Sequence, residues 1–192
     1  MAAEQKKEQP LGPDPHSYAN INEIRVTHLK LNLKVNFPEK RFQGFVDIDA
    51  EVVGPSASVL KLDVKNLAIE SVQDASGELL QWTLPQHHSA LGQCLVIPFP
   101  TKTTGQTVSF RVHYLTTERS GGIQFLDAEQ TAEKKHPLVY TQGEAILSRT
   151  LVPCQDTPAV KAPYDISVTC PAPLVCIYAH TAIRSDCCCP PS

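Results

Sequence analysis

Residues 29–52 read LKLNLKVNFPEKRFQGFVDIDAEV and decide the fold, because apolar and polar residues alternate on both sides of one polar bend. A period of two is typical of a half-buried strand. We therefore predict two antiparallel strands, 29–37 and 42–52, joined as a long hairpin around the bend at 38–40. Lysines in the first strand and carboxylates in the second are predicted to face each other, and such pairs contribute up to ~1 kcal/mol each.

Outward from this hairpin the chain continues with short apolar runs separated by Gly, Pro, Ser and Asn. Strands are predicted at 59–64, 67–72, 79–84, 93–99, 108–114, 164–169 and 174–180. The polar segment 120–137 is predicted to be a loop with one helical turn at 128–132. Many short strands with turn signals between them indicate an all-β fold, either a sandwich or a saddle-shaped assembly of twisted sheets.

Composition and charge exclude several classes of partner. With 42% hydrophobic and 19% charged residues the chain is typical of a globular protein, and its formal net charge of -3 offers no basic surface for nucleic acid or an anionic membrane. Residues 1–20 lack the apolar centre of a secretory signal, and no apolar run approaches the ~20 residues that cross a bilayer. Seven cysteines without regular spacing favour a reducing compartment, so we expect a cytoplasmic protein.

The candidate binding residues are Gln142, Gly143, Glu144 and Ala145, within the segment YTQGEAILSRTLVPCQDTPAVK at 140–161. A glutamate among small and apolar residues is costly to bury unless a cation or several donors meet it. One interpretation is an internal ion pair with Arg149 that fixes a loop. The other is a cleft in which Gln142 and Glu144 receive the ammonium group of a substrate.

Catalytic signatures are missing from the sequence. It contains no His-Glu-x-x-His, Gly-x-Ser-x-Gly, phosphate-binding Gly-rich loop or Cys-x-x-Cys. The adjacent His87 and His88 are predicted to be ordinary loop residues rather than ligands. We therefore predict no catalytic residue and no metal ligand in this chain.

Five segments carry a resemblance to a known family. In order they are THLKLNLKVNF, FVDIDAEV, LDVKNLAIESV, EQTAEKKHPLVYTQGEAILSR and LVPCQDTPAVKAPYDISV. They resemble the N-terminal domain of the zinc aminopeptidases of peptidase family M1, closest to the leukotriene A(4) hydrolase and aminopeptidase B branch. The resemblance extends from Ile24 to Asp186, and the block 129–161 is its most specific part. It divides the chain into a flexible polar lead-in at 1–20, an all-β N-terminal domain at 21–186 and a non-family tail at 187–192.

The resemblance implies a fold, a site and a partner. The fold would be an all-β, saddle-like assembly that packs on a thermolysin-like catalytic domain. The site would be Gln142, Gly143 and Glu144, closed by Ala145, reaching over the zinc of that domain to bind the free N-terminus of a peptide. A charge-assisted hydrogen bond of this kind contributes about 1.5–3 kcal/mol. The leukotriene hydrolase branch usually carries glutamine at the position of Glu144, so glutamate here favours peptides over lipid epoxides.

The family's zinc motif and Gly-x-Met-Glu-Asn segment do not occur in these 192 residues. Without zinc no bound water has its pKa lowered toward ~7, so we expect no cofactor in this chain and no independent hydrolysis. Two hypotheses stay open. The chain is the recognition domain of a cytosolic zinc aminopeptidase, active only when joined to its catalytic part, or it is a stand-alone, non-catalytic binding or regulatory module.

The C-terminal residues 187–192 read CCCPPS and have three interpretations. Prolines replace the aliphatic residues of a prenylation box, which argues against lipidation. Adjacent cysteines are poorly placed to bind one tetrahedral metal ion. We predict that this tail is a foreign end, as produced by alternative splicing or by a truncated gene model.

Overall fold

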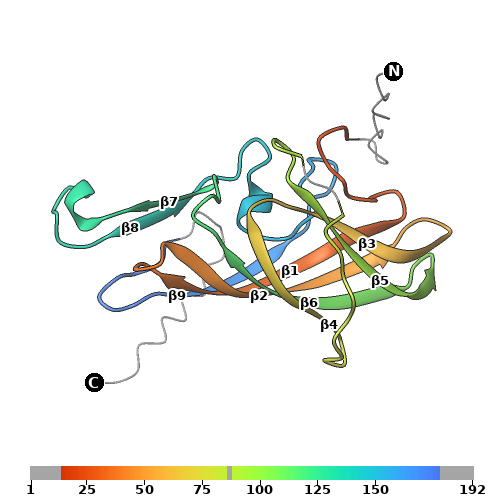
Figure 1. Cartoon of the computed structure of the whole chain (residues 1–192). Coiled ribbons are helices and arrows are strands. Elements are labelled where there is room, and N and C mark those ends of the chain that lie inside the picture. Colours follow the sequence, from red (N-terminus) through yellow and green to blue (C-terminus); the bar gives the residue numbers. More distant parts are fainter. Residues whose placement is uncertain (1–13, 86–87, 178–192) are drawn as a thin grey trace, which may run out of the picture.

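The chain folds into curved β-sheets, and the computed structural model describes residues 14–85 and 88–177. Five strands form a mixed sheet in the order β4-β6-β2-β1-β9, and the pairs β3-β5 and β7-β8 form two antiparallel ribbons (Figure 1). The all-β prediction with antiparallel and mixed sheets is confirmed. The strands are β1 (Ile24–Asn36), β2 (Arg41–Val52), β3 (Ser56–Val64), β4 (Leu67–Asp74), β5 (Gln93–Thr103), β6 (Thr107–Thr116), β7 (Ile123–Leu126), β8 (Leu138–Thr141) and β9 (Tyr164–Thr169).

Helical structure in the described ranges is limited to two 3₁₀ turns, η1 (Ala128–Gln130) and η2 (Ser148–Thr150). The first falls inside the helical turn predicted at 128–132. No helix in this part of the chain is long and apolar enough to cross a membrane.

The predicted hairpin is formed by β1 and β2. Leu31 stands opposite Val46 and Val35 opposite Phe42. All four side chains are buried, because the period-two pattern puts them on the same face of the sheet. The hairpin therefore confirms the strand pattern that the sequence predicts.

The predicted facing of lysine and carboxylate across the hairpin is confirmed at one position, but the carboxylate there bonds to a third strand. Lys30 stands opposite Asp47, as expected. However, Asp47 accepts two hydrogen bonds from Arg111 of β6, 2.6 Å and 2.9 Å long. The Arg111 guanidinium also lies 4.1 Å from the centre of the Phe45 ring. A planar guanidinium matches a carboxylate with two parallel bonds, which a lysine cannot do, so Arg111 is the favoured partner.

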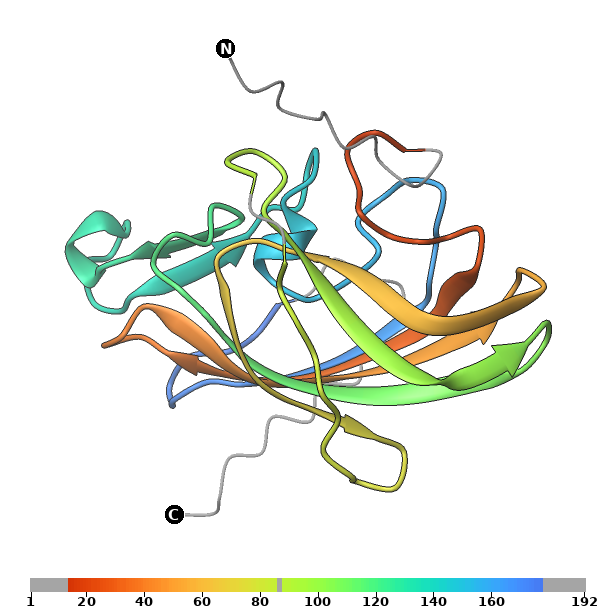
Figure 2. The same ribbon diagram turned by 45° about the vertical axis from the view of Figure 1, so that its right-hand side comes forward.

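The hydrophobic core lies between one face of the five-stranded sheet and the β3-β5 ribbon, which Figure 2 shows crossing above that face. Both layers contribute aliphatic side chains with no exposed surface. Burying each one contributes about 1.5–3 kcal/mol. Val46, Ile48 and Val112 come from the sheet, and Leu60, Leu62, Leu95 and Ile97 come from the ribbon.

Two predicted strands are absent from the described residues. The run 79–84 makes only isolated bridges, Gln73 with Leu79 and Thr83 with Val96. The run predicted at 174–180 is not a strand over 174–177, and its last three residues lie outside the described ranges.

The β7-β8 hairpin was missed, and its first strand lies in the segment predicted to be a loop. Each strand has four residues, too few for a period to show. Aromatic contacts hold this ribbon to the end of the β1-β2 hairpin. The Phe125 ring centre lies 5.9 Å from those of both Phe37 and Phe42. Tertiary packing therefore specifies this element rather than its own alternation.

Residues 14–20 of the predicted lead-in at 1–20 are among the described residues, and several of them contact the domain. Ser17, Ala19 and Asn20 are buried. The Ser17 hydroxyl donates to Asp63 at 2.5 Å, and the Asn20 side chain both donates to and accepts from the backbone of β3. These bonds join residues 17–20 to the domain. The predicted tail at 187–192 lies outside the described residues.

A buried phenol supplies a stability test. Tyr114 is fully buried, and among the described residues its hydroxyl has no hydrogen-bond partner. An unpaired buried polar group costs about 1–3 kcal/mol. Tyr114→Phe is therefore expected to raise the free energy of unfolding by about 1 kcal/mol in urea denaturation. Tyr140→Phe, at a half-exposed ring, should leave it unchanged. A lower stability for Tyr114→Phe would show that the hydroxyl is paired.

Candidate functional site

The four predicted site residues follow β8 and are exposed. The Gln142 backbone N–H donates to the Gly122 carbonyl oxygen at 2.8 Å, and the Leu147 backbone N–H donates to the Gly143 carbonyl oxygen at 2.9 Å. These bonds hold Gln142–Ala145 as a turn that leaves the ribbon and enters η2. The peptide bond between Glu144 and Ala145 is cis.

Close backbone approach at two glycines determines where this turn lies. A side chain at Gly122 would come within 2.7 Å of the Thr150 hydroxyl and 2.9 Å of two carbonyl oxygens. One at Gly143 would meet the Ser148 hydroxyl at 2.8 Å. The two carbonyl oxygens at Gly122 belong to the backbone and cannot move aside, so this position requires glycine, whereas the Ser148 side chain can rotate away from a side chain at position 143. The Gly122 amide also donates to the Thr150 hydroxyl at 3.0 Å.

Arg149 does not pair with Glu144, so the internal ion pair of these two residues is wrong. The guanidinium is fully buried and donates to the Asp156 carboxylate at 2.8 Å. It also donates to the carbonyl oxygens of Leu91 and His16, each at 2.9 Å, and lies 3.5 Å from the Asp63 carboxylate. Glu144 is left exposed.

Arg149, Asp63 of β3 and Asp156 form a buried cluster of charged side chains. Asp63 was not among the residues predicted from the sequence. Its carboxylate accepts hydrogen bonds from the Ser17 hydroxyl and from the amides of Tyr18 and Asp156. Burial raises the pKa of Asp63, while the charge of Arg149 and these hydrogen bonds lower it by a smaller amount. The one sequence signal was an aspartate at the apolar end of a predicted strand.

The turn at 153–158 connects to the sheet through Gln155 and Asp156. The buried Gln155 side chain accepts a hydrogen bond from the Val26 backbone N–H at 2.9 Å and donates one to the Ile24 carbonyl oxygen at 3.0 Å. Both partners lie beside the irregularity in β1. The Asp156 carboxylate accepts a hydrogen bond from the Arg149 guanidinium. The segment 149–156 is thus held from beneath by buried polar groups while Gln142–Ala145 stays accessible.

Gln142, Gly143, Glu144 and Ala145 all line one cavity of about 1140 Å³. Its floor is the apolar face shared by β1 and β9, where Leu31 stands beside Ile166 and Leu33 beside Val168. Residues of β8 and of the segment 147–160 also line the cavity, and Figure 2 shows these two segments above the sheet. The cavity is a groove with four polar or small site residues on an otherwise mainly apolar lining.

Large apolar side chains are exposed around this groove. Val175 and Ile177 are 71% and 90% exposed, and three further large apolar residues are about half exposed. All five line the groove. Such a contiguous patch is typical of an interaction surface. The three half-exposed residues are Leu138, Tyr140 and Tyr164.

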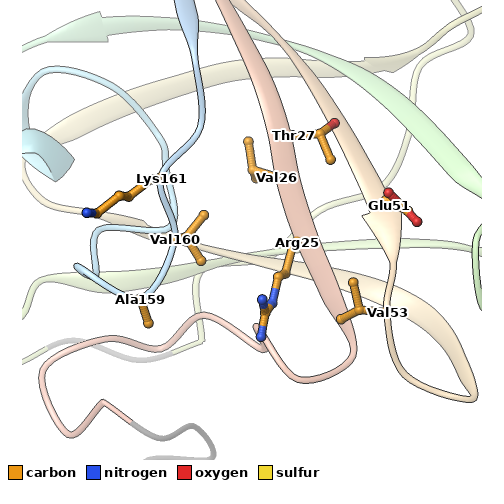
Figure 3. A pocket seen from close by; sticks show the side chains of 8 residues that line it. All are labelled: Arg25, Val26, Thr27, Glu51, Val53, Ala159, Val160 and Lys161. Atoms are coloured by element: carbon orange, nitrogen blue, oxygen red, sulfur yellow. The ribbon is translucent and has the colours of Figure 1, made fainter.

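A second, smaller cavity of about 320 Å³ lies at the start of β1 (Figure 3) and shares Val26 and Val160 with the groove lining. It is lined by two cations, Arg25 and Lys161, and by Glu51. Their charged ends point in different directions in Figure 3, and Arg25 donates to the Ile21 carbonyl at 3.0 Å. Binding sites need converging polar groups, so this cavity is a weaker candidate than the groove.

The described residues contain no set of three His, Cys, Asp or Glu side chains that could hold a metal ion. A catalytic zinc site needs three protein ligands and an open position. This part of the chain therefore does not fit a zinc ion, and no catalytic step is assigned to it.

Comparison with curated proteins finds leukotriene A-4 hydrolases and leucine aminopeptidases. The chain is 33% identical over 165 residues to leukotriene A-4 hydrolase of Xenopus laevis, covering 85% of this chain and 27% of that protein. It is 37% identical over 158 residues to leucine aminopeptidase 2-2 of Scheffersomyces stipitis, covering 82% of this chain and 24% of that protein. The chain thus spans about a quarter of these relatives.

Solved structures agree with this result. Yeast LTA4 hydrolase in complex with bestatin matches with a TM-score of 0.74 and 26% identity, covering 89% of this chain and 26% of that one. Solved relatives include a two-domain M1 zinc metallopeptidase. The model of the peptidase M1 N-terminal domain matches residues 15–186. The chain therefore belongs to the peptidase M1 N-terminal domain family, as its sequence resemblance predicted.

Proposed function

We propose that this chain is the substrate-recognition domain of a zinc aminopeptidase and that Gln142, Gly143 and Glu144 bind the free N-terminus of a peptide. The observation that carries this proposal is the exposed Glu144 on the wall of a large groove. Arg149 is occupied by Asp156 and Asp63, so the Glu144 charge is available to a ligand. An exopeptidase must recognise a terminal ammonium, for which carboxylate and amide oxygens are suitable acceptors.

The proposed partner is the catalytic domain of a full-length family protein, docked on the groove. Supporting this partner, the five exposed apolar residues around the groove border the same cavity as Glu144. A domain seated there would cover them and bring its own zinc and catalytic residues toward Gln142–Ala145. A stand-alone module would instead leave this apolar surface in water, which disfavours the second hypothesis.

Peptides are the proposed substrates rather than lipid epoxides. The named relatives include both a leukotriene hydrolase and an aminopeptidase. A negatively charged Glu144 matches the ammonium of a peptide, whereas the neutral glutamine typical of the leukotriene hydrolase branch does not carry that charge. A cytoplasmic setting is also proposed, because the cysteines have no regular spacing and such cysteines are typical of a reducing compartment.

A chimera tests the proposal in a complete enzyme. This chain replaces the matching quarter of the Scheffersomyces stipitis leucine aminopeptidase, and hydrolysis of an amino-acid amide is measured. Glu144→Ala is expected to lower kcat/KM by roughly 10- to 150-fold, since about 1.5–3 kcal/mol of binding is lost. The matched control, Glu133→Ala, removes a glutamate that is also exposed but lies outside the groove lining. It should leave kcat/KM unchanged.

Three outcomes would contradict the proposal. Equal kcat/KM for the Glu144→Ala and Glu133→Ala chimeras would remove the role of Glu144. A folded, zinc-loaded chimera without activity would show that this domain does not serve peptide recognition. Zinc-dependent turnover by the isolated chain would contradict the assignment of catalysis to a separate domain.

A further inference from the structure

Two cysteines meet on the wall of the groove, where the chain turns back after β9. Cys170 follows the last residue of β9, and Cys176 lies on the returning segment. Their sulfur atoms are 3.5 Å apart. The Cys176 sulfur also lies 3.7 Å from the Val168 carbonyl oxygen, and the Cys170 sulfur lies 3.2 Å from the Leu174 carbonyl oxygen. Both sulfurs thus contribute contacts between the returning segment and the end of β9.

The geometry allows a covalent bond with little movement. A disulfide places its sulfurs about 2.05 Å apart, so the two sulfurs must approach by about 1.5 Å. Small rotations about the side-chain bonds supply that displacement. Five residues separate the two cysteines, and the backbone already forms the required turn, with the Leu174 amide donating to the Pro171 carbonyl at 3.0 Å.

Exposure distinguishes this pair from the other two described cysteines. Cys170 and Cys176 are partly exposed, whereas Cys94 and Cys154 are buried. Burial raises the pKa of Cys94 to about 11 and raises that of Cys154 as well, so these two stay protonated and unreactive. Among the four described cysteines, oxidants therefore reach Cys170 and Cys176 first.

We propose that Cys170 and Cys176 form a reversible disulfide that locks residues 171–177 against β9. With hydrogen peroxide as oxidant, one thiolate attacks the peroxide and becomes a sulfenic acid, releasing water. The second thiol displaces the hydroxyl group, and a second water leaves. Two thiols lose two electrons and two protons in total. A dithiol reductant returns them by exchange, so the bond is transient in a reducing compartment.

The bond would fix one wall of the groove. Cys170, Cys176 and their neighbours Leu174, Val175 and Ile177 all line it. In the reduced protein the contacts of these two thiols with this wall are non-covalent. In the oxidised protein it is covalently closed onto the end of β9.

The test treats the purified chain with a small excess of hydrogen peroxide. Digestion and mass spectrometry then locate the bridge. We expect one disulfide between Cys170 and Cys176, a mass loss of about 2 Da, and complete reversal by a dithiol. Cys94 and Cys154 should remain thiols. Hydrogen exchange of residues 164–177 should slow by about tenfold on oxidation, because the bridge restricts local opening.

A serine variant and the tail cysteines make the test decisive. Cys176→Ser should abolish both the bridge and the slower exchange while leaving the urea midpoint of the reduced protein unchanged. A disulfide that joins Cys170 or Cys176 to Cys187, Cys188 or Cys189 instead would overturn the proposal. So would two intact thiols after the oxidant is consumed, or oxidised protein whose exchange is unchanged.

Discussion

Replacing Arg149 with methionine is expected to lower the free energy of unfolding by about 3–5 kcal/mol, as is typical when one partner of a buried ion pair is removed. The guanidinium is fully buried and is the cation beside both Asp63 and Asp156. Methionine has a similar length but leaves these carboxylates without a counter-charge. It also leaves the carbonyl oxygens of Leu91 and His16 without their donor. Urea denaturation at pH 7 measures the loss.

Arg119→Met is the matched control, because Arg119 is exposed. A surface substitution of this kind changes stability by no more than about 0.5 kcal/mol. If Arg149→Met costs no more than Arg119→Met, the buried cluster does not hold the segment 149–156 in place.

The same comparison at lower pH identifies the source of the loss. Burial raises the pKa of Asp63 above 3.8, and the Arg149 charge opposes that shift, so removing Arg149 raises this pKa further. A carboxyl group with a raised pKa in the folded state destabilises the fold as the pH rises through that pKa. The deficit of Arg149→Met should therefore shrink as the pH falls from 7 toward 4. A deficit independent of pH would exclude Asp63 as its source.

The hairpin was predictable from the sequence and the buried cluster was not, for one physical reason. In the strands of 29–52 apolar and polar residues alternate with a period of two, which is a local pattern of the sequence. Asp63, Arg149 and Ser17 are far apart in the chain and meet only in the folded protein. No local pattern encodes such a meeting, so one of the two interpretations paired Arg149 with its near neighbour Glu144.

The site itself shows the same division. The resemblance located Gln142–Ala145 as a segment, and the structure adds that it lines a groove and is exposed. Its position depends on Gly122 and Thr150, which pack against it from elsewhere in the chain. The sequence predicts both strands of the groove floor but not their pairing, because the parallel pairing of β9 with β1 is a contact between distant segments. Whether the four residues bind a peptide N-terminus stays a prediction.

Replacing both Leu138 and Ile177 with glutamate is expected to weaken the binding of an apolar fluorescent dye to the chain by about tenfold or more. The two side chains lie on different parts of the groove and are 49% and 90% exposed. Charges there would make the exposed apolar surface unfavourable for a dye, while the core would keep its packing. Dye titration gives the affinity, and urea denaturation should show a stability change within about 1 kcal/mol.

Leu79→Glu is the matched control, because Leu79 is 67% exposed but does not line the groove. It should leave dye affinity unchanged, and equal affinities for the control and the double variant would show that the groove is not the apolar surface of this chain. In the chimera, replacing both Leu138 and Ile177 with glutamate should weaken the docked contact between this domain and the catalytic domain. Glu144→Ala should instead lower activity while the two domains stay docked. Under the proposal we therefore expect docking and recognition to be separable: docking would depend on the apolar area around the groove, and recognition on the Glu144 carboxylate at its wall.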